Sequence, residues 1–147
     1  MSIILRNATR ADQTAIKAIV RAAQINPTGL NWQRFIVAVD GDKLVALGQV
    51  KPHRDGSREL ASIATIPERQ RHGLSRQIIE ALPAREHGDL YLMCRAPLVA
   101  FYERFGFHRA LPAELPPLFR LADKATRFWG GAVMKRPAPV TPKGENT

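Results

Sequence analysis

A strand-to-helix junction lies near the middle of this chain and reads Ile63-Ala64-Thr65-Ile66-Pro67-Glu68-Arg69-Gln70-Arg71-His72-Gly73-Leu74-Ser75-Arg76. The apolar residues before Pro67 indicate a strand, and those after Gly73 recur at helical spacing, namely Leu74, Ile78, Ile79 and Leu82. Backbone N–H groups at a helix N-terminus carry partial positive charge, and a glycine lets an anion come close to them. The junction therefore predicts a cradle for a phosphorylated ligand.

The residues of this junction also admit a simpler interpretation. Glycine-containing strand-to-helix turns are common, and an ordinary capped turn explains the segment about as well as a phosphate cradle does. Cationic donors surround the turn, namely Arg69, Arg71, His72 and Arg76. Neither a Walker loop, Gly-x-x-x-x-Gly-Lys-Ser/Thr, nor a dinucleotide fingerprint, Gly-x-Gly-x-x-Gly, occurs in the chain. The junction alone leaves both interpretations open.

A second segment, about thirty residues later, reads Leu98-Val99-Ala100-Phe101-Tyr102-Glu103-Arg104-Phe105-Gly106-Phe107. It predicts a short helix that a glycine ends, followed by the start of a strand. Together the two segments resemble the GNAT superfamily of acetyl-CoA-dependent N-acetyltransferases, over about residues 3–135. The family's cofactor loop, Gln/Arg-x-x-Gly-x-Gly/Ala, is matched by Gln70, Gly73 and Ser75, and its later helix, Phe-Tyr-x-x-x-Gly-Phe, by Phe101, Tyr102, Gly106 and Phe107.

The resemblance implies an α/β (α+β) fold with a central mixed, mostly antiparallel β-sheet and helices on both of its faces. The 147 residues, 45% of them hydrophobic, suit one domain with one core. We expect this N-acetyltransferase-like domain to span residues 1–135. The tail 136–147 is rich in proline and has almost no apolar side chains, so we expect it to be disordered.

Periodicity and turn residues place the elements along the chain. Strands are expected at residues 3–7, 34–40, 43–50, 59–66, 90–94, around 107 and at 132–135, with a tight hairpin at Asp40-Gly41-Asp42. Helices are expected at residues 11–24, after the capping-box-like Thr9-Arg10-Ala11-Asp12, and at 73–82 and 98–105. A further helix is suggested by the spacing of Leu118, Leu121, Ala125 and Phe128.

Composition limits the cellular setting. No stretch of eighteen apolar residues occurs and the first residues read as a strand rather than a signal peptide, so we expect a soluble cytoplasmic protein without membrane contact. A single cysteine, Cys94, excludes an internal disulfide framework, and its apolar neighbours predict a small buried side chain. The four histidines show no metal-ligand spacing, so we expect no metal.

The chain is strongly basic, with 22 Lys and Arg against 13 Asp and Glu and a net charge of +9. Such a charge is typical of nucleic-acid binding, but the arginines are dispersed and their densest cluster lies in the expected cofactor loop. We therefore expect a solvated cationic surface that attracts the phosphates of coenzyme A. Nucleic acid is not expected to be the main partner.

Acetyl transfer to an amine requires a neutral amine and a proton for the departing thiolate. A lysine-like amine has a pKa of about 10.4, so a base or a water relay must remove its proton near neutral pH. By resemblance Tyr102 is the acid that protonates the thiolate, the alternative being an aromatic residue that only packs. Glu59 is the candidate base because it stands eleven residues before Gln70, as the base does in relatives that acetylate histone lysines. A solvated strand end is the alternative for Glu59.

The resemblance also implies which residues hold acetyl-CoA. The strand residues Ile63, Ala64 and Thr65 would offer backbone N–H and C=O groups to the pantetheine arm. The loop residues would surround the pyrophosphate, namely Gln70, Arg71, His72, Gly73, Leu74, Ser75 and Arg76. Ser75 departs from the family's Gly or Ala, which its small side chain should tolerate. Arg95 stands where many relatives place a cofactor-binding asparagine, which puts that contact in doubt.

The residues and the resemblance together predict an N-acetyltransferase, an acyltransferase that moves an acetyl group from acetyl-CoA to a primary amine by direct attack. The acceptor is left open between a small molecule and a protein amine. Leu90 stands where relatives that acetylate a ribosomal protein's N-terminus carry a glutamate, which disfavours that specificity. The alternative is a non-catalytic acyl-CoA-binding or nucleic-acid-binding module on the same fold, and a homodimer is left open.

Overall fold

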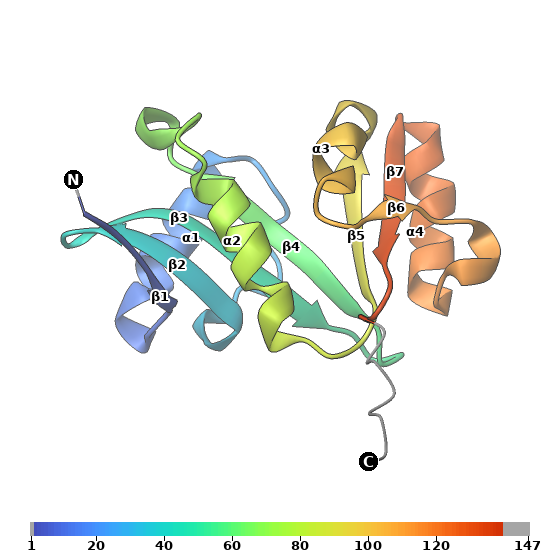
Figure 1. Ribbon diagram of the computed structural model, residues 1–147, viewed down its shortest axis with the longest axis horizontal. Coiled ribbons are helices and arrows are strands. Elements are labelled where there is room, and N and C mark those ends of the chain that lie inside the picture. The colour runs from blue at the N-terminus through green and yellow to red at the C-terminus, as the bar shows by residue number, and fades with distance from the viewer. Residues whose placement is uncertain (1, 140–147) are drawn as a thin grey trace, which may run out of the picture.

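Apolar runs separated by tight turns fold into a β-sheet flanked by helices in the computed structural model, which describes residues 2–139 (Figure 1). In the order in which they lie in the sheet, the strands of this part of the chain are β1 (Ile3–Asn7), β2 (Phe35–Asp40), β3 (Lys43–Pro52), β4 (Arg58–Thr65), β5 (Leu90–Arg95), β7 (Gly131–Arg136) and β6 (His108–Arg109). Its α-helices are α1 (Gln13–Ala22), α2 (Leu74–Ala81), α3 (Val99–Glu103) and α4 (Pro117–Phe128). The predicted mixed, mostly antiparallel sheet is confirmed.

The sheet consists of two antiparallel parts that meet at one point. β1, β2, β3 and β4 form the first part, and β5, β7 and β6 form the second. The parallel pair β4–β5 joins them, and among the described residues its single register pair is Glu59 with Tyr91. Beyond this pair β4 and β5 diverge, so their inner edges separate in a V (Figure 1).

The two faces of the sheet are packed differently, because alternate strand residues point to opposite faces. On one face, α2 and α3 share a continuous core that reaches across both parts of the sheet, with members such as Ile36, Ile78, Leu92 and Val99. On the other face, α1 and α4 pack as two separate clusters, the first around Ile16 and Val20 and the second around Phe119. This second face therefore has an interrupted core, and β3 and β4 carry buried polar side chains there.

Local sequence explains the turns and the start of the first helix. The hairpin between β2 and β3 turns at Gly41, whose φ of +59° suits a residue without a side chain. Ahead of α1 the predicted capping box is present, because the Thr9 N–H donates to the Asp12 carboxylate at 2.7 Å. Arg6 donates to the same carboxylate at 2.7 Å. The hydrogen bond from Arg6 is the main reason why the pKa of Asp12 is lowered to about 2, and the hydrogen bonds from Thr9 lower it further.

A close approach of α2 to the sheet depends on Gly48 in the middle of β3. A Cβ atom at this position would lie 2.6 Å from the side chains of both Ile63 and Ile78. The missing side chain therefore lets the helix lie directly on β3 and β4. This contact fixes the helix that follows the strand-to-helix junction against the strand that precedes it.

The helix expected near residue 118 is present as α4, but the stripe that suggested it is exposed. Leu118 is 41%, Leu121 71% and Phe128 95% exposed. The buried face is formed instead by Phe119, Asp123 and Thr126. Phe119 determines this orientation, because its ring is fully buried and stacks on Tyr91 of β5 with 5.1 Å between centroids. Within residues 2–139 no helix is long and apolar enough to cross a membrane.

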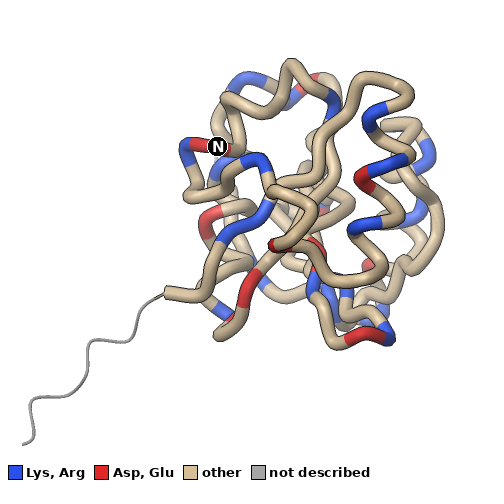
Figure 2. Tube along the Cα trace, turned by 90° about the vertical axis from the view of Figure 1, so that its right-hand side faces the viewer, with Lys and Arg blue, Asp and Glu red and all other residues tan. Residues whose placement is uncertain are grey.

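The expected tail begins inside the fold. Arg136 is the last residue of β7, and the Ala138 N–H donates to the Asp89 carboxylate at 2.7 Å. Residues 140–147, the rest of that tail, lie outside the described part of the chain. Lys and Arg positions are spread along the described part of the trace (Figure 2).

Candidate active site

The loop before α2 forms an open turn with free backbone donors. Gly73 caps the helix in the left-handed conformation with a φ of +76°, and Arg71 shares this conformation with a φ of +69°. The Gln77 N–H is bonded to the Gly73 carbonyl at 3.1 Å. The N–H groups of residues 71–76 precede this bond and have no acceptor within the described chain. Nothing lies within 4 Å of where a Gly73 Cβ would be, so an anion can reach these N–H groups.

The side chains of this loop divide into those that shape it and those that face solvent. Ser75 shapes it through a hydrogen bond of 2.7 Å between its Oγ and Thr65 Oγ1, and the Gln70 amide donates to the Thr65 carbonyl at 3.3 Å. Leu74 is buried in the core, so only its N–H is available. The expected cofactor residues Arg71 and His72 are exposed and remain available to a phosphate.

Two of the loop's arginines have partners within the protein. Arg69 pairs with Asp40 at the end of β2. Arg76 pairs with Glu80 one turn along α2, at 3.1 Å. This second pair is largely exposed, so a phosphate can compete for the Arg76 guanidinium.

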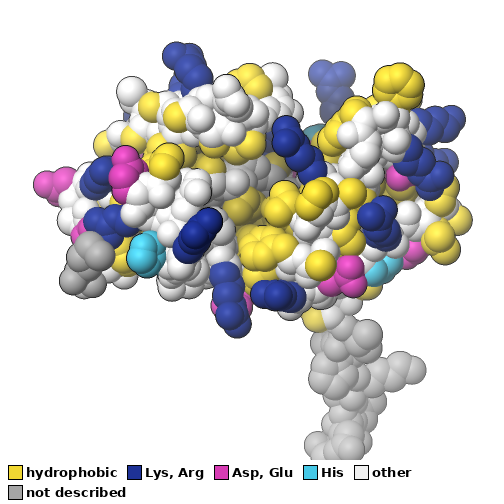
Figure 3. All heavy atoms as spheres, turned by 90° about the horizontal axis from the view of Figure 1, so that it is seen from above, with side chains coloured by type: hydrophobic (Ala, Val, Ile, Leu, Met, Phe, Trp, Pro, Cys, Tyr) yellow, Lys and Arg dark blue, Asp and Glu magenta, His cyan; other side chains and the backbone are white. Residues whose placement is uncertain are grey.

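The strand residues expected to bind pantetheine lie on the part of β4 that has separated from β5. Ile63 packs toward α2, and Ala64 is buried in the α1 cluster. Their side chains are therefore occupied, and only backbone groups can meet a ligand along this edge. Seen from the open end of the V, hydrophobic side chains line the hollow between the two parts of the molecule, and Lys and Arg side chains lie at its rim (Figure 3).

Tyr102 lies on α3, on the face shared with α2. Its ring makes edge contacts with Phe101 and Phe107, at centroid distances of 5.2 and 6.2 Å. Burial, with a smaller contribution from the Cys94 thiol, raises the pKa of Tyr102 to about 12. No hydrogen bond to its hydroxyl is found among residues 2–139. The phenol therefore stays protonated near neutral pH and has a proton to donate.

Glu59 lies at the closed end of the V, on the face of the sheet opposite to that of Tyr102. It is only 9% exposed, and its Oε1 is 2.9 Å from His53 Nε2. The His53 ring in turn meets the edge of Phe119 at 5.8 Å. A thioester held between β4 and β5 would therefore have the phenol on one side and the carboxylate on the other.

Sequence reasoning missed polar residues that share the face of Glu59. Gln49 is fully buried and Lys51 is 8% exposed, and both project from β3 toward the loop between α1 and β2. Their alternation in an otherwise apolar strand, at positions 49, 51 and 53, is the signal that could have found them.

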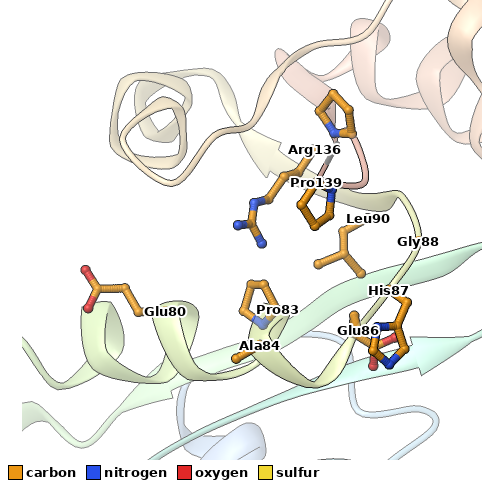
Figure 4. A pocket seen from close by; sticks show the side chains of 10 residues that line it. Glu80, Pro83, Ala84, Glu86, His87, Gly88, Leu90, Arg136 and Pro139 are labelled. Atoms are coloured by element: carbon orange, nitrogen blue, oxygen red, sulfur yellow. The ribbon is translucent and has the colours of Figure 1, made fainter. Parts of the chain in front are cut away.

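A surface pocket of about 380 Å³ lies at the other end of α2 and is separate from this site. It is lined by Glu80, Pro83, Glu86, His87, Leu90 and Arg136, and the Arg136 side chain extends toward α2 (Figure 4). In the part of the chain that the structure describes, no group of three or more His, Cys, Asp or Glu could hold a metal ion.

A diverging strand edge that leads to an anion cradle suits the pantetheine arm and the pyrophosphate of an acyl-CoA. Comparison with known proteins agrees. Residues 31–109 match the acetyltransferase (GNAT) domain, and the chain belongs to this family of acetyl-CoA-dependent acyltransferases.

Individual relatives are distant in sequence. Mycothiol acetyltransferase from Rhodococcus jostii (strain RHA1) is 26% identical over 144 residues, which cover 89% of this chain and 47% of that protein. The chain thus spans about half the length of this curated relative.

Solved structures share the fold. Rv2747 from Mycobacterium tuberculosis, in complex with CoA and NLQ, superposes with a TM-score of 0.75 and 19% identity over 92% of this chain and 99% of that one. N-acetylglutamate synthase from Neisseria gonorrhoeae, complexed with coenzyme A and N-acetyl-glutamate, superposes with a TM-score of 0.72 and 18% sequence identity. The match covers 95% of this chain and 36% of that one. The ribosomal-protein-S18-alanine N-acetyltransferase from Escherichia coli superposes with a TM-score of 0.65 and 21% sequence identity over 99% of both chains.

Proposed function

We propose that this chain transfers an acetyl group from acetyl-CoA to a primary amine by direct attack on the thioester. Acetyl-CoA would lie in the V between β4 and β5. Residues 63–65 of β4 would bind the pantetheine arm through their backbone, and the N–H groups of residues 71–76 would bind the pyrophosphate. The free donors at the N-terminus of α2, next to this open strand edge, are the observation that carries the proposal.

The chemistry assigns one proton transfer to each side of the thioester. Glu59 takes a proton from the ammonium of the acceptor, directly or through a water, and so frees its lone pair. The amine nitrogen then bonds to the acetyl carbon, and the carbon–sulfur bond breaks. The coenzyme A thiolate leaves with the electron pair and receives the Tyr102 proton, while the acceptor nitrogen loses its second proton to solvent and the Tyr102 phenolate takes a proton back from solvent. General acid and base groups of this kind typically contribute about 10²–10⁴-fold each.

His53 supports the role of Glu59 in this mechanism. Its Nε2 is 2.9 Å from the Glu59 carboxylate, and the contact with Phe119 holds the ring in place. The carboxylate is therefore oriented by a positioning residue whose ring packs against the buried Phe119. A solvated strand end would not need such a partner, and this favours the base role.

Thiol release from acetyl-CoA, measured across a panel of amino acids, polyamines and peptides, tests the proposal. We expect release that depends on one acceptor class. Tight acetyl-CoA binding without release for any acceptor would instead favour the non-catalytic acyl-CoA-binding alternative. The acceptors differ among the relatives by name, so the names alone do not select one.

The proposal extends to the setting of the enzyme. A cytoplasmic location is supported by Cys94, which is a buried free thiol without a disulfide partner. Acetylation of a ribosomal protein's N-terminus remains disfavoured because of Leu90, which is a buried core residue.

A further inference from the structure

A polar cluster interrupts the core on the face that carries α1 and α4. We call it the acceptor cluster and define it as Gln49, Lys51, His53, Glu59 and Ser62. It lies between the two apolar clusters of this face, beside the candidate base. Within it Gln49 Nε2 donates to Ser62 Oγ at 2.8 Å, and His53 pairs with Glu59 at 2.9 Å.

Two members of the acceptor cluster lack partners. Gln49 Oε1 is buried and accepts no hydrogen bond from the described residues. Lys51 is 8% exposed, and within residues 2–139 its ammonium makes neither a hydrogen bond nor an ion pair. Burying the Gln49 oxygen without a partner is unfavourable because it loses its hydration, and the Lys51 ammonium, which still reaches solvent, is a cation without a protein partner among the described residues. Such groups beside a catalytic base point to a ligand that supplies what they lack.

We infer that the acceptor substrate is an amino acid or a similar small molecule, in which a carboxylate stands close to the amine that is acetylated. The inference rests on the proposed function and adds to it the class of acceptor. The carboxylate would bind the Lys51 ammonium. The amine would lie between the Glu59 carboxylate, which takes its proton, and Gln49 Oε1, which accepts a hydrogen bond from it.

The register of β3 and β4 sets the size of this acceptor. Lys51 and Glu59 are direct cross-strand partners, and such neighbours have Cβ atoms roughly 4.5–5.5 Å apart. Glu59 pairs with His53, and no ion pair between Lys51 and Glu59 is formed. The Lys51 ammonium and the Glu59 carboxylate thus come from neighbouring positions on the two strands. A molecule with an amine and a carboxylate a few bonds apart complements both.

The loop between α1 and β2 supplies a fixed wall for this acceptor. Gln13 of α1 holds the loop at two points, donating to the Leu30 carbonyl at 2.6 Å and accepting from the Trp32 N–H at 2.8 Å. The loop backbone then lies against Lys51 at Gly29. A Cβ there would come within 2.9 Å of Lys51 Cε, and the φ of Gly29 is +67°. The loop backbone therefore packs closely against the end of the Lys51 side chain.

The same charge argues against polyamines as acceptors. A polyamine would bring a second ammonium near Lys51, and like charges at close range repel each other. A peptide fits only where its N-terminal residue has an acidic side chain, because the amine of an ordinary peptide has no carboxylate nearby. The cluster thus separates three classes of amine that the fold alone does not.

Thiol release from acetyl-CoA with matched acceptors tests the inference. Each reactive amino acid is compared with its primary amide and with its decarboxylated amine, and a dipeptide amide with an N-terminal aspartate distinguishes a peptide source of the carboxylate. We expect the free acid to exceed its amide by at least about 10-fold in kcat/KM, because charge-assisted hydrogen bonds are the strong ones. A polyamine such as spermidine should react least.

Lys51→Met keeps the length of the side chain and removes the charge. We expect it to lower kcat/KM for the free acid by about 10- to 100-fold, mainly by raising KM. The kcat/KM for the amide, which lacks the carboxylate, and the KM for acetyl-CoA should not change. Lys43→Met, at an exposed lysine at the start of the same strand, is the matched control. Lys51→Arg should keep part of the preference, and it replaces Lys51→Met if that variant does not fold.

The outcomes separate the inference from the function on which it rests. An amide that equals its acid, a preferred polyamine, or an unchanged acid-to-amide ratio in Lys51→Met would overturn the amino-acid acceptor and leave the acetyltransferase standing. Absence of thiol release with every acceptor, while calorimetry still shows acetyl-CoA binding, would overturn both. Calorimetric titration of the reactive amino acid into coenzyme-A-bound protein gives a second readout that does not depend on turnover.

Discussion

Replacing Tyr102 by phenylalanine separates its catalytic role from its packing role. The ring contacts with Phe101 and Phe107 survive this change, and no internal hydrogen bond is lost among the described residues. Folding and acetyl-CoA affinity should therefore be preserved. A thiolate with a pKa of about 8.5, like that of cysteine, is a weaker base than the phenolate of Tyr102, so the phenol can donate to it only because it is well placed. Without that phenol, turnover should fall by about 10- to 10³-fold, since water substitutes in part as the acid.

The raised pKa of Tyr102 adds a dependence on pH to this prediction. With a pKa of about 12 the phenol remains protonated up to pH 10, so wild-type turnover should not decline there through loss of the acid. The folded pKa lies above the unfolded one, so the associated stability is present below about pH 10 and lost as the pH rises toward 12. Tyr102→Phe should lack this alkaline loss of stability.

The measurements are initial rates of thiol release at several pH values, with urea unfolding at pH 8 and near pH 11. Tyr102→Phe protein that binds acetyl-CoA normally and turns over at the wild-type rate would refute the role of general acid. An equal alkaline loss of stability in both proteins would refute the buried environment assigned to the phenol.

Three further predictions follow from other parts of the structure. Gly73→Val should weaken acetyl-CoA binding by at least about 10-fold in calorimetry, because a branched side chain at φ +76° would fill the cradle; Gly73→Ala shares the strain without the bulk, and an equal loss in both would assign the effect to backbone strain. Glu59→Gln should lower turnover near pH 7 and recover in part at pH 9–10, where free amine accumulates; an unchanged pH profile would point to a different base. Asp12→Asn should cost about 1–2 kcal/mol of unfolding free energy at pH 7, because Arg6 and Thr9 lose a charged partner. The pKa of Asp12 is lowered to about 2, so its stabilisation is present above about pH 4 and should disappear as the pH falls toward 2, as acid titrations of both proteins would show.

Local features of the fold could be predicted from the sequence because they depend on neighbours along the chain. The hairpin at Gly41, the capping box at Asp12 and the helix after Gly73 all appear where the pattern placed them. The orientation of α4 could not be obtained in this way. Its apolar stripe stays exposed, and the stacking of Phe119 on Tyr91 buries instead a face that also carries Asp123 and Thr126.

Only part of the candidate site could be predicted from the sequence, for a similar reason. The cofactor loop is contiguous in sequence, so Gly73 and Ser75 could be recognised together. Lys51 and Glu59 come from different strands and become neighbours only through the β3–β4 register. Nor could the pairing of Arg69 with Asp40 be read from the loop, because it joins residues 29 positions apart.

The single residue pair that joins β4 to β5 has a mechanical consequence. Two half-sheets connected along whole strands would move as one plate, whereas a connection at Glu59 and Tyr91 can act as a hinge. The core shared by α2 and α3 spans both halves and resists bending on its own side, while the opposite face has two separate clusters with no common core. Bending of the molecule would therefore widen or narrow the face that carries Lys51 and Glu59, and the carboxylate of Glu59 lies at the pivot.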